Sequence, residues 1–208
     1  MRRAISRIIA PATLALLLVS CGKKEDAPPP ASAGPAPAES AKIEGLPSSE
    51  WTDASADFFG PAGETMGSAT FRDGLGGVLI RIEVSGLAPG WHGVHLHMVG
   101  DCSDGADGFK ASGGHINPDG REHGLLNPNG SHRSDLPNLF ADGNGGAKAE
   151  LFRAGVHLKP SEEAAAMNGP FPLMDDDGFA VIIHESPDDH MTQPIGGAGA
   201  RVACAAVK

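Results

Sequence analysis

The sequence is poor in positive charge. Its 16 Lys and Arg residues face 26 Asp and Glu residues, so the formal net charge is −10 with histidine neutral. Nucleic acids and anionic lipid surfaces attract basic proteins, and this charge balance argues against both as general partners. The chain also lacks a segment with a convincing long helical period, so short strands are the expected elements.

The apolar run near the N-terminus is too short to cross a membrane comfortably. It extends from Ile8 to Val19 behind three arginines, which predicts an export signal over residues 1–20. The run ends in the string LVSC, which resembles a bacterial lipobox with Cys21 as the lipidated residue. The alternative is an ordinary secretory signal with a chance cysteine. We expect an exported, membrane-anchored lipoprotein that faces the periplasm or the cell surface.

Large apolar residues are almost absent from residues 21–49, which are rich in Ala, Pro and Ser. Such a segment cannot offset its own ordering entropy, so we predict a lipid-anchored flexible linker. Residues 50–208 have the right length for one domain with a sizeable core. Loss of residues 1–20 would leave 13 basic and 26 acidic residues, a formal charge of −13. An anionic substrate would therefore need a local positive field.

Cysteine is scarce, with three residues in the chain. If Cys21 carries lipid, Cys102 and Cys204 remain as a pair in an oxidising compartment, which predicts a disulfide. Closing a loop of about one hundred residues would stabilise the fold by about 4–5 kcal/mol in the chain-entropy model. The alternative is two free thiols that bind metal, although both lie outside the spacing of the histidines.

Short strands with glycine-rich turns dominate the domain. Val78, Ile80, Ile82 and Val84 are separated by Leu79, Arg81 and Glu83, a period of two that indicates a strand with one buried face. Similar runs lie at about 53–59, 64–72, 92–98, 147–152, 178–184 and 199–206. This pattern favours an antiparallel sandwich or barrel.

Two long stretches interrupt the strands, at about 99–142 and about 160–177. Loops of this length need a reason. The first contains four candidate metal ligands and Cys102, so coordination and cross-linking are expected to hold it. In the second, the alanine-rich residues 162–167 could form one or two helical turns, to which we assign no chemistry.

Candidate metal ligands recur along the domain. They are His95, His97, His115, His123, His132, Asp135 and His184. Imidazole suits copper and zinc, whereas calcium and magnesium prefer all-oxygen sites. His95 and His97 would share one face of a strand, with His184 on a neighbouring strand as a third ligand, although each could equally be a structural histidine. The remaining three histidines and Asp135 are enough to saturate a tetrahedral zinc.

Five strings resemble the copper,zinc superoxide dismutase family, in its bacterial lipoprotein form. They are GVHLH at 93–97, GGHINP at 113–118, HRSDLPNL at 132–139, VIIHE at 181–185 and GARVAC at 199–204. The resemblance extends from about residue 54 to the C-terminus. It implies an all-β fold, a Greek-key, immunoglobulin-like β-sandwich or flattened barrel of about eight antiparallel strands with long metal-binding loops.

The resemblance also implies one copper and one zinc ion per subunit. It places copper on His95, His97, His115 and His184, and zinc on His115, His123, His132 and Asp135. His115 would bridge the two ions as an imidazolate and would be a candidate proton carrier.

Further roles follow from the same resemblance. Asp188 matches an aspartate that joins a copper histidine to a zinc histidine, here expected to be His97 and His123; one more solvated acid is the alternative. Arg201 matches the arginine that attracts and places superoxide beside copper. Residues 190–200 lack the guiding charges of eukaryotic members, so Lys110 is a candidate for substrate guidance by its position.

The implied reaction is the dismutation of superoxide to dioxygen and hydrogen peroxide by a Cu(II)/Cu(I) cycle with a structural zinc, protecting the cell envelope. A non-enzymatic copper/zinc-binding envelope lipoprotein is the alternative, and it would be expected to lose a copper ligand or the arginine. A non-catalytic structural domain is a third reading. The residues leave the oligomeric state open, with a homodimer as one option. His92, His157 and His190 lie outside the ligand set, and Trp51 and Trp91 are expected in the core or an interface.

Overall fold

The computed structural model describes residues 53–74, 76–159 and 171–208, where the chain consists mainly of strands and loops. The strands are β1 (Ala54–Phe59), β2 (Thr65–Gly74), β3 (Gly77–Val84), β4 (Gly90–His92), β5 (Val94–His97), β6 (Leu139–Ala141), β7 (Ala147–Ala154), β8 (Val156–His157), β9 (Phe171–Pro172), β10 (Phe179–His184) and β11 (Arg201–Val207). The predicted export signal, Cys21, the linker, Trp51 and the segment 162–167 lie outside the described residues.

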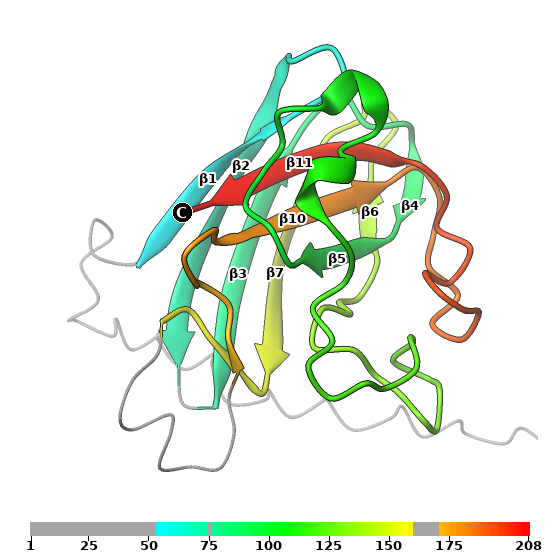
Figure 1. The fold of residues 1–208 in the computed structure, drawn as a ribbon. Helices are drawn as coiled ribbons and strands as arrows, with labels where there is room; N and C mark the ends of the chain where they lie inside the picture. The colour runs from blue at the N-terminus through cyan, green and yellow to red at the C-terminus, as the bar shows by residue number, and fades with distance from the viewer. Residues whose placement is uncertain (1–52, 75, 160–170) are drawn as a thin grey trace, which may run out of the picture. The chain divides into compact units, whose positions relative to one another are not determined.

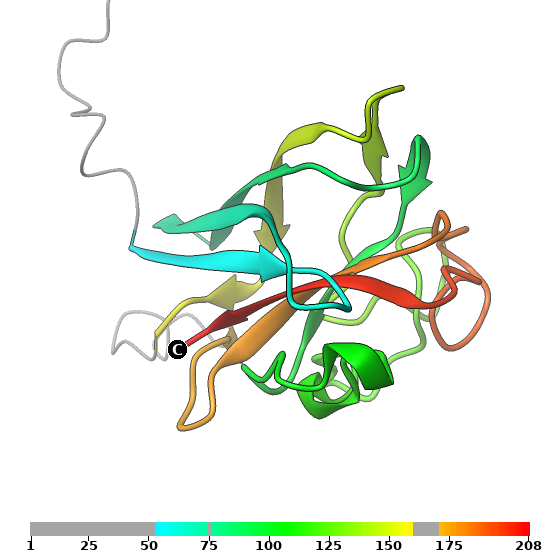
Figure 2. The ribbon, with the colours of Figure 1, turned by 90° about the horizontal axis from the view of Figure 1, so that it is seen from above.

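Seven strands form one antiparallel sheet in the order β5-β10-β11-β1-β2-β3-β7. Figures 1 and 2 show this sheet curled into a half-barrel, with β4 and β6 paired separately. Two short 3-10 helices, η1 (Gly105–Asp107) and η2 (Lys110–Ser112), interrupt the long loop after β5. Among the described residues, no helix is long and apolar enough to cross a membrane. The predicted all-β sandwich or flattened barrel is confirmed.

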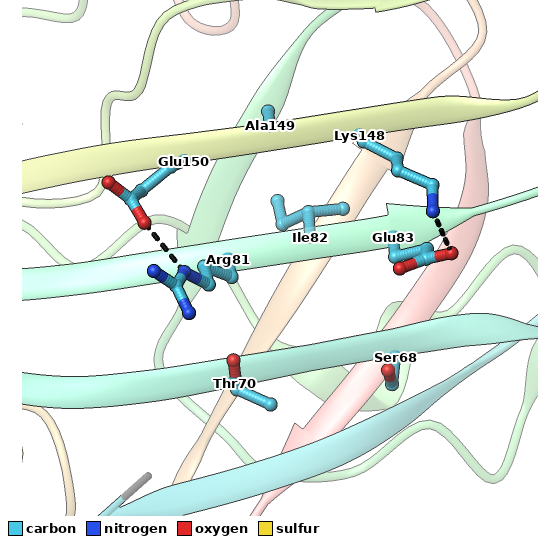
Figure 3. A pocket seen from close by; sticks show the side chains of 8 residues that line it. All are labelled: Ser68, Thr70, Arg81, Ile82, Glu83, Lys148, Ala149 and Glu150. Carbon is cyan, nitrogen blue, oxygen red and sulfur yellow. Dashed lines mark hydrogen bonds and ion pairs between the residues drawn. The ribbon is translucent and has the colours of Figure 1, made fainter. Parts of the chain in front are cut away.

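Strand β3 shows the predicted alternation. Ile80, Ile82 and Val84 are buried, whereas Arg81 and Glu83 between them are exposed. On the outer face, Arg81 pairs with Glu150 of β7 at 2.6 Å, and Lys148 pairs with Glu83 (Figure 3). Such exposed pairs contribute at most about 1 kcal/mol each. These four side chains are about half exposed or more, so the hollow that they line is a solvated part of the sheet surface.

Strands β5 and β10 are buried on both faces. On one face, Val94 of β5 and Val181 of β10 join the main apolar core. On the other face, Ile182 of β10 packs with Phe109 and Cys204 in a smaller cluster. Because Phe109 belongs to the long loop after β5, this loop covers the outer face of the sheet.

The disulfide between Cys102 and Cys204 confirms the predicted pair, with Cα atoms 5.8 Å apart. Cys102 lies at the start of the long loop and packs against the cluster of Phe109 and Ile182, whereas Cys204 lies in the middle of β11. The bridge therefore fastens the loop to the outer face of the sheet.

The structure departs from the predicted strands in three places. The run at 92–98 is two strands, β4 and β5, separated by Gly93, where a Cβ atom would lie 2.9 Å from that of Ala198. A short strand, β6, lies inside the predicted loop at 99–142, and β9 lies inside the stretch at 160–177. Strand β9 pairs with β8 in parallel, an exception to the antiparallel rule. These added strands have two or three residues, too few to show a period in the sequence.

Candidate metal centre

Strands β5 and β10 place three histidines on the outer face of the sheet. In the antiparallel register, Ile182 lies opposite His95 and Ala180 lies opposite His97. Directly opposed residues share a face, so both histidines lie on the side that the long loop covers. His184 ends β10, after a register shift, and lies opposite Arg201 of β11. All three histidines are buried.

Each of these imidazoles has one nitrogen engaged and one free. The Nδ1–H groups of His97 and His184 donate to the carbonyl oxygens of Gly113 and Gly199, both at 2.9 Å, so each Nε2 keeps its lone pair. His95 uses Nε2 in a 2.9 Å bond to Asp188, which leaves Nδ1. The three remaining nitrogens are buried and have no hydrogen-bond partner among the described residues, and the same is true of Nε2 of His115. Buried lone pairs of this kind are the expected property of metal ligands.

Three of these residues converge. The candidate ligand atoms of His95, His115 and His184 lie within 4.8 Å of one another. His97 is just outside that set, with its ring centroid 5.2 Å from that of His115 and 6.4 Å from that of His184. The four imidazoles could hold a copper ion.

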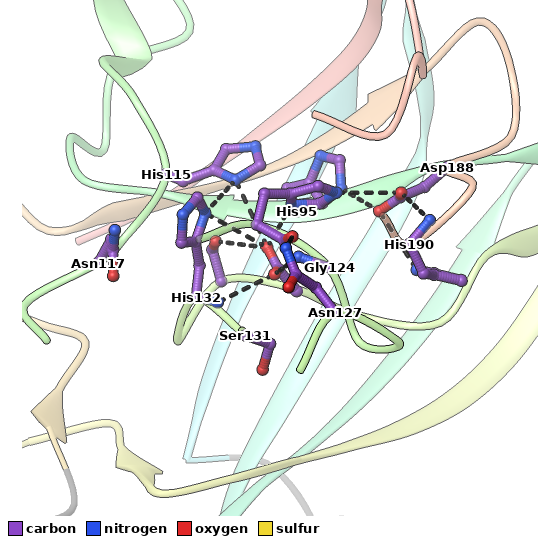
Figure 4. Close-up of polar contacts among 12 residues, drawn as sticks. His95, His115, Asn117, Gly124, Asn127, Ser131, His132, Asp188 and His190 are labelled. Carbon is purple, nitrogen blue, oxygen red and sulfur yellow. Dashed lines mark hydrogen bonds and ion pairs between the residues drawn. The ribbon is translucent and has the colours of Figure 1, made fainter. Parts of the chain in front are cut away.

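A second cluster lies in the long loop. Its members are His115, His123, His132 and Asp135, and their candidate ligand atoms also lie within 4.8 Å of one another. Here the atoms contact each other directly. Nδ1 of His115 lies 3.0 Å from Nδ1 of His132 (Figure 4). Nδ1 of His123 lies 3.0 Å from Oδ1 of Asp135. Three imidazoles and one carboxylate suit a tetrahedral zinc ion.

His115 belongs to both clusters. Its Nδ1 faces His132 and Asp135, whereas its Nε2 belongs to the group of partnerless nitrogens beside the strand histidines. The loop reaches the sheet through isolated bridges that pair His97 with His115 and His95 with Asp135. One imidazole ring therefore links the two candidate metal sites.

Asp188 joins the two clusters, but not through the histidine that we predicted. Its Oδ2 accepts from Nε2 of His95 at 2.9 Å, and its Oδ1 accepts from Nε2 of His123 at 3.0 Å. The prediction of His97 was therefore wrong, because Nδ1 of His97 binds Gly113 instead. Asp188 lies near the start of β5, where a Cβ atom on Gly93 would be 3.4 Å from that of Asp188. His95 is closer along the strand to Gly93 than His97 is, which explains why His95 is the partner.

Burial keeps the three strand histidines neutral. It is the main cause that lowers the pKa of His95 to about 3, that of His97 to about 2 and that of His184 to about 4. Neutral imidazole is the form that binds metal ions. These side chains therefore need not release a proton before they coordinate.

His123 has the opposite shift. Burial lowers its pKa, but the hydrogen bonds that its ring donates to Asp135 and Asp188 outweigh burial and raise the pKa to about 9. Burial also favours the neutral form of the two carboxyl groups, yet their bonds to histidine hold the pKa of each well below its usual range. In the absence of metal, His123 is therefore an imidazolium between two carboxylates.

Arg201 projects from β11 beside His184 and is held by the long loop. Its Nη1 donates to the carbonyl oxygen of Phe109 at 2.6 Å and to Oγ of Ser112 at 3.1 Å, and its Nη2 donates to the carbonyl oxygen of Gly113 at 2.9 Å. Lys110 lies exposed in η2, next to Phe109. Lys110 thus belongs to the same turn of the loop that holds the guanidinium of Arg201.

Two residues that support the site were given no role from the sequence, although Asn138 lies in the string at 132–139. The amide of Asn138 donates to the carbonyl of Asp188 and accepts from its N–H, at 2.8 and 2.9 Å. The amide of Gln193 holds the backbone of His123 in the same two-way manner, at 2.8 Å for each bond. Such residues lie far from their partners in the chain, and only their neighbourhood to candidate ligands could have drawn attention to them.

The three remaining histidines differ in their surroundings. His92 is buried, with its ring nitrogens 2.7 Å from the carbonyl oxygens of His184 and Ala88, which is a structural role. His190 lies against Asp188, with Nδ1 at 3.3 Å from Oδ2. His157 faces Asp73. Among the described residues, none of the three belongs to a metal-ligand cluster.

Comparisons with known proteins agree with this geometry. The family model described as copper/zinc superoxide dismutase (SODC) matches residues 65–207. A superoxide dismutase [Cu-Zn] of Caulobacter vibrioides is 45% identical over 147 residues, covering 70% of this chain and 80% of the relative. Superoxide dismutase [Cu-Zn] 2 of Aquifex aeolicus is 36% identical over 156 residues, covering 74% and 86%.

Solved structures give the same result. A superoxide dismutase-like protein from Bacillus subtilis superposes with a TM-score of 0.66 at 32% identity, covering 73% of this chain and 96% of that one. The Cu/Zn superoxide dismutase from Brucella abortus superposes with a TM-score of 0.54 at 27% identity, covering 74% and 98%. From its fold, its histidine clusters and these matches, the chain belongs to the copper/zinc superoxide dismutase family.

Proposed function

We propose that this protein is a superoxide dismutase that converts two superoxide anions and two protons into dioxygen and hydrogen peroxide. The observation that carries the proposal is the set of four buried imidazole nitrogens without partners, in the residues expected to bind copper: His95, His97, His115 and His184. Zinc would be held by His115, His123, His132 and Asp135, which form the saturated cluster in the loop. One copper and one zinc ion per subunit is the composition that these donors suit.

The metals and the protein chain have different roles in this proposal. Copper held by His95, His97, His115 and His184 would supply one-electron Cu(II)/Cu(I) chemistry, and zinc would have no redox role. The chain fixes the ligand nitrogens through second hydrogen bonds and keeps the imidazoles neutral by burial. His115 can hold a proton at Nε2, the nitrogen that lies among the strand histidines, and is therefore the candidate proton carrier.

Arg201 supplies the positive charge that an anionic substrate needs in a protein of formal charge −10. The loop occupies both Nη1 hydrogens and one Nη2 hydrogen, and Nε has no partner in the part of the chain that the structure describes. The Nε–H and the second Nη2 hydrogen can therefore donate to a small anion. The envelope metal-binding alternative is less well supported, because such a protein would need neither Arg201 nor a complete set of copper ligands.

The test measures metal content and superoxide dismutation in the wild type, His184→Ala and Arg201→Ala. We expect His184→Ala to lose copper and activity, because the site loses one of its strand nitrogens. Arg201→Ala should retain both metals, but its rate of superoxide dismutation should be lower and should depend less on salt concentration. Full activity in His184→Ala would refute the copper assignment, and loss of copper from Arg201→Ala would refute the role of the guanidinium.

We also propose that the protein is exported and anchored through lipid on Cys21. The lipobox string supports the anchor, and the disulfide between Cys102 and Cys204 fits an oxidising compartment outside the cytoplasm. Cys21→Ser should move the protein from the membrane fraction to the soluble fraction. Continued membrane attachment of that variant would exclude lipid on Cys21.

A homodimer is the proposed assembly. Trp91 of β4 and Phe140 of β6 form an edge-to-face pair with centroids 5.0 Å apart, yet they are 55% and 52% exposed. Exposed aromatic residues of this kind are common at interfaces. Sedimentation should give a dimer for the wild type and a monomer for Trp91→Glu. A monomeric wild type would remove the proposal.

A further inference from the structure

Ser112, the last residue of η2, is 0% exposed and lies between Arg201 and His97. Its Oγ accepts from Nη1 of Arg201 at 3.1 Å and lies 3.4 Å from Nδ1 of His97. The hydroxyl itself donates to the carbonyl oxygen of Phe109 at 2.8 Å. The side chain therefore contacts the proposed substrate-binding guanidinium and approaches a proposed copper ligand.

The hydrogen-bonding capacity of this hydroxyl is fully used. A serine hydroxyl has one donor and two acceptor positions. The donor faces Phe109, one acceptor position faces Arg201, and the other is within weak reach of His97, whose Nδ1–H mainly binds Gly113. A buried hydroxyl satisfied in this way holds a defined rotamer. It can therefore transmit a fixed orientation to the groups around it.

The loop that carries Ser112 is itself anchored. Phe109 adopts a left-handed backbone conformation, with φ of 54°, and its buried ring packs with Ile182 and Cys204. Asp104 accepts from the N–H of Ala111 at 3.0 Å. A left-handed conformation at a residue such as Phe109 persists only where the surrounding packing enforces it. The Phe109 carbonyl oxygen, which accepts from both Ser112 and Arg201, is therefore held in a defined position.

We propose that Ser112 is a positioning residue for anion binding, an inference that rests on the proposed dismutase function. Its Oγ takes the second Nη1 hydrogen of Arg201, so that end of the guanidinium is saturated. The Nε–H and the free Nη2 hydrogen then remain as the donors for the substrate anion. Without the hydroxyl, Arg201 keeps its bonds to Phe109 and Gly113, but the guanidinium can tilt about them. A smaller fraction of the protein then has the Nε–H and the free Nη2 hydrogen oriented toward the anion.

The first measurement is independent of copper. In the zinc-loaded, copper-free protein, NMR can follow rotation about the Cζ–Nη bonds of Arg201. We expect faster rotation of the Nη1 group in Ser112→Ala, slow rotation as in the wild type in Ser112→Thr, and no change in Ser68→Ala, a serine on the outer face of β2. Unchanged rotation in Ser112→Ala would overturn the proposal, whatever the activity of the protein.

The second measurement uses azide as a monoanionic probe of the Cu(II) protein. Ser112→Ala should weaken azide binding roughly three- to tenfold, the effect of one hydrogen bond, with copper and zinc contents unchanged. Ser112→Thr should restore binding. In a background of Arg201→Ala, the Ser112→Ala change should have no further effect, because Ser112 acts through Arg201.

The outcomes separate this proposal from the dismutase proposal. Wild-type protein that loads both metals but neither binds azide nor dismutates superoxide would contradict the function, while the NMR result for Ser112 would stand by itself. An equal loss of azide affinity with and without Arg201 would contradict the positioning role. Loss of copper from Ser112→Ala would do so too, because it would show that the hydroxyl acts on His97.

Discussion

The strand half and the loop half of the metal centre are built differently. In the strand half, His95, His97 and His184 come from adjacent strands, and their ligand nitrogens are buried without partners. In the loop half, His123 is hydrogen-bonded to Asp135 at 3.0 Å, and His115 to His132 at the same distance. In the strand half, backbone pairing holds the histidines in place while their ligand nitrogens stay free of hydrogen bonds. In the loop half, the ligand atoms are hydrogen-bonded to one another.

This difference indicates that the order of the two halves depends on metal binding to different degrees. The sheet fixes the strand histidines whether or not copper is bound, because their positions follow from ladder hydrogen bonds and core packing. The backbone bonds of the loop are mostly local turns, and its ligand residues are held largely by side-chain contacts, so zinc should order it. Metal binding in such a segment contributes directly to folding.

The largest expected effect follows from this contrast. Zinc added to the metal-free protein should raise the free energy of unfolding by up to about 10 kcal/mol, the scale of structural zinc sites. Asp135→Ala should lose most of that gain, whereas His184→Ala should keep it, because His184 is outside the zinc cluster. Denaturant unfolding with and without one equivalent of zinc is the measurement. An equal loss in both variants would show that the two halves form one unit.

The next effect is on the pH dependence of the metal-free protein. The folded pKa values of His95, His97 and His184, about 3, 2 and 4, lie below the unfolded value of 6.5. As pH falls below about 6.5, the unfolded chain takes up protons that the folded chain refuses. Stability should therefore fall, by up to about 4 kcal/mol per pH unit for three sites.

Deprotonation of His123 should lower the stability of the metal-free protein at alkaline pH. Its folded pKa of about 9 exceeds the unfolded value, so its contribution is complete below about pH 6.5 and is lost as pH rises through 9. One site changes stability by at most about 1.4 kcal/mol per pH unit. Unfolding in the presence of a chelator across this range should show a maximum near pH 6.5. A flat profile would contradict the buried, neutral state of the strand histidines.

A smaller effect should come from the residue that joins the halves. Asp188→Asn leaves one oxygen acceptor for the two N–H groups of His95 and His123, and it places an NH2 group against one of them. We expect both copper and zinc affinities to fall about 10- to 100-fold, the usual cost of losing such a support. Asp189→Asn, at the exposed neighbouring position, is the matched control. A change in the affinity for one metal alone would show that Asp188 serves only that half.

The smallest effect concerns Lys110, which lies beside the loop anchor of Arg201. Its removal in Lys110→Ala should slow superoxide capture by about twofold or less and reduce the salt dependence, because one exposed charge is partly screened. Lys148→Ala, on the outer face of β7, should change neither. Stopped-flow rates at several ionic strengths would distinguish these outcomes, and equal behaviour of the two variants would exclude guidance by Lys110.

Sequence patterns predicted the elements with a strong local signal. The alternation over residues 78–84 placed β3 and its buried face correctly, and the two domain cysteines gave the disulfide. The partner of Asp188 was not predictable, since His95 and His97 differ only in which loop each one meets. Ser112 and Gln193 were missed for a related reason: their hydrogen bonds connect distant loops, whose course the sequence does not specify.

The opposite faces of β5 and β10 have a consequence for how this protein can change over evolutionary time. Val94, Leu96, Val181 and Ile183 pack in the main core, while the residues between them support the histidine centre. Alternate positions in these strands therefore have separate requirements, apolar packing on one face and metal coordination on the other. The core can drift among aliphatic side chains of similar volume while the electron-transfer site stays intact, which separates thermal adaptation from catalytic adaptation within a few consecutive residues.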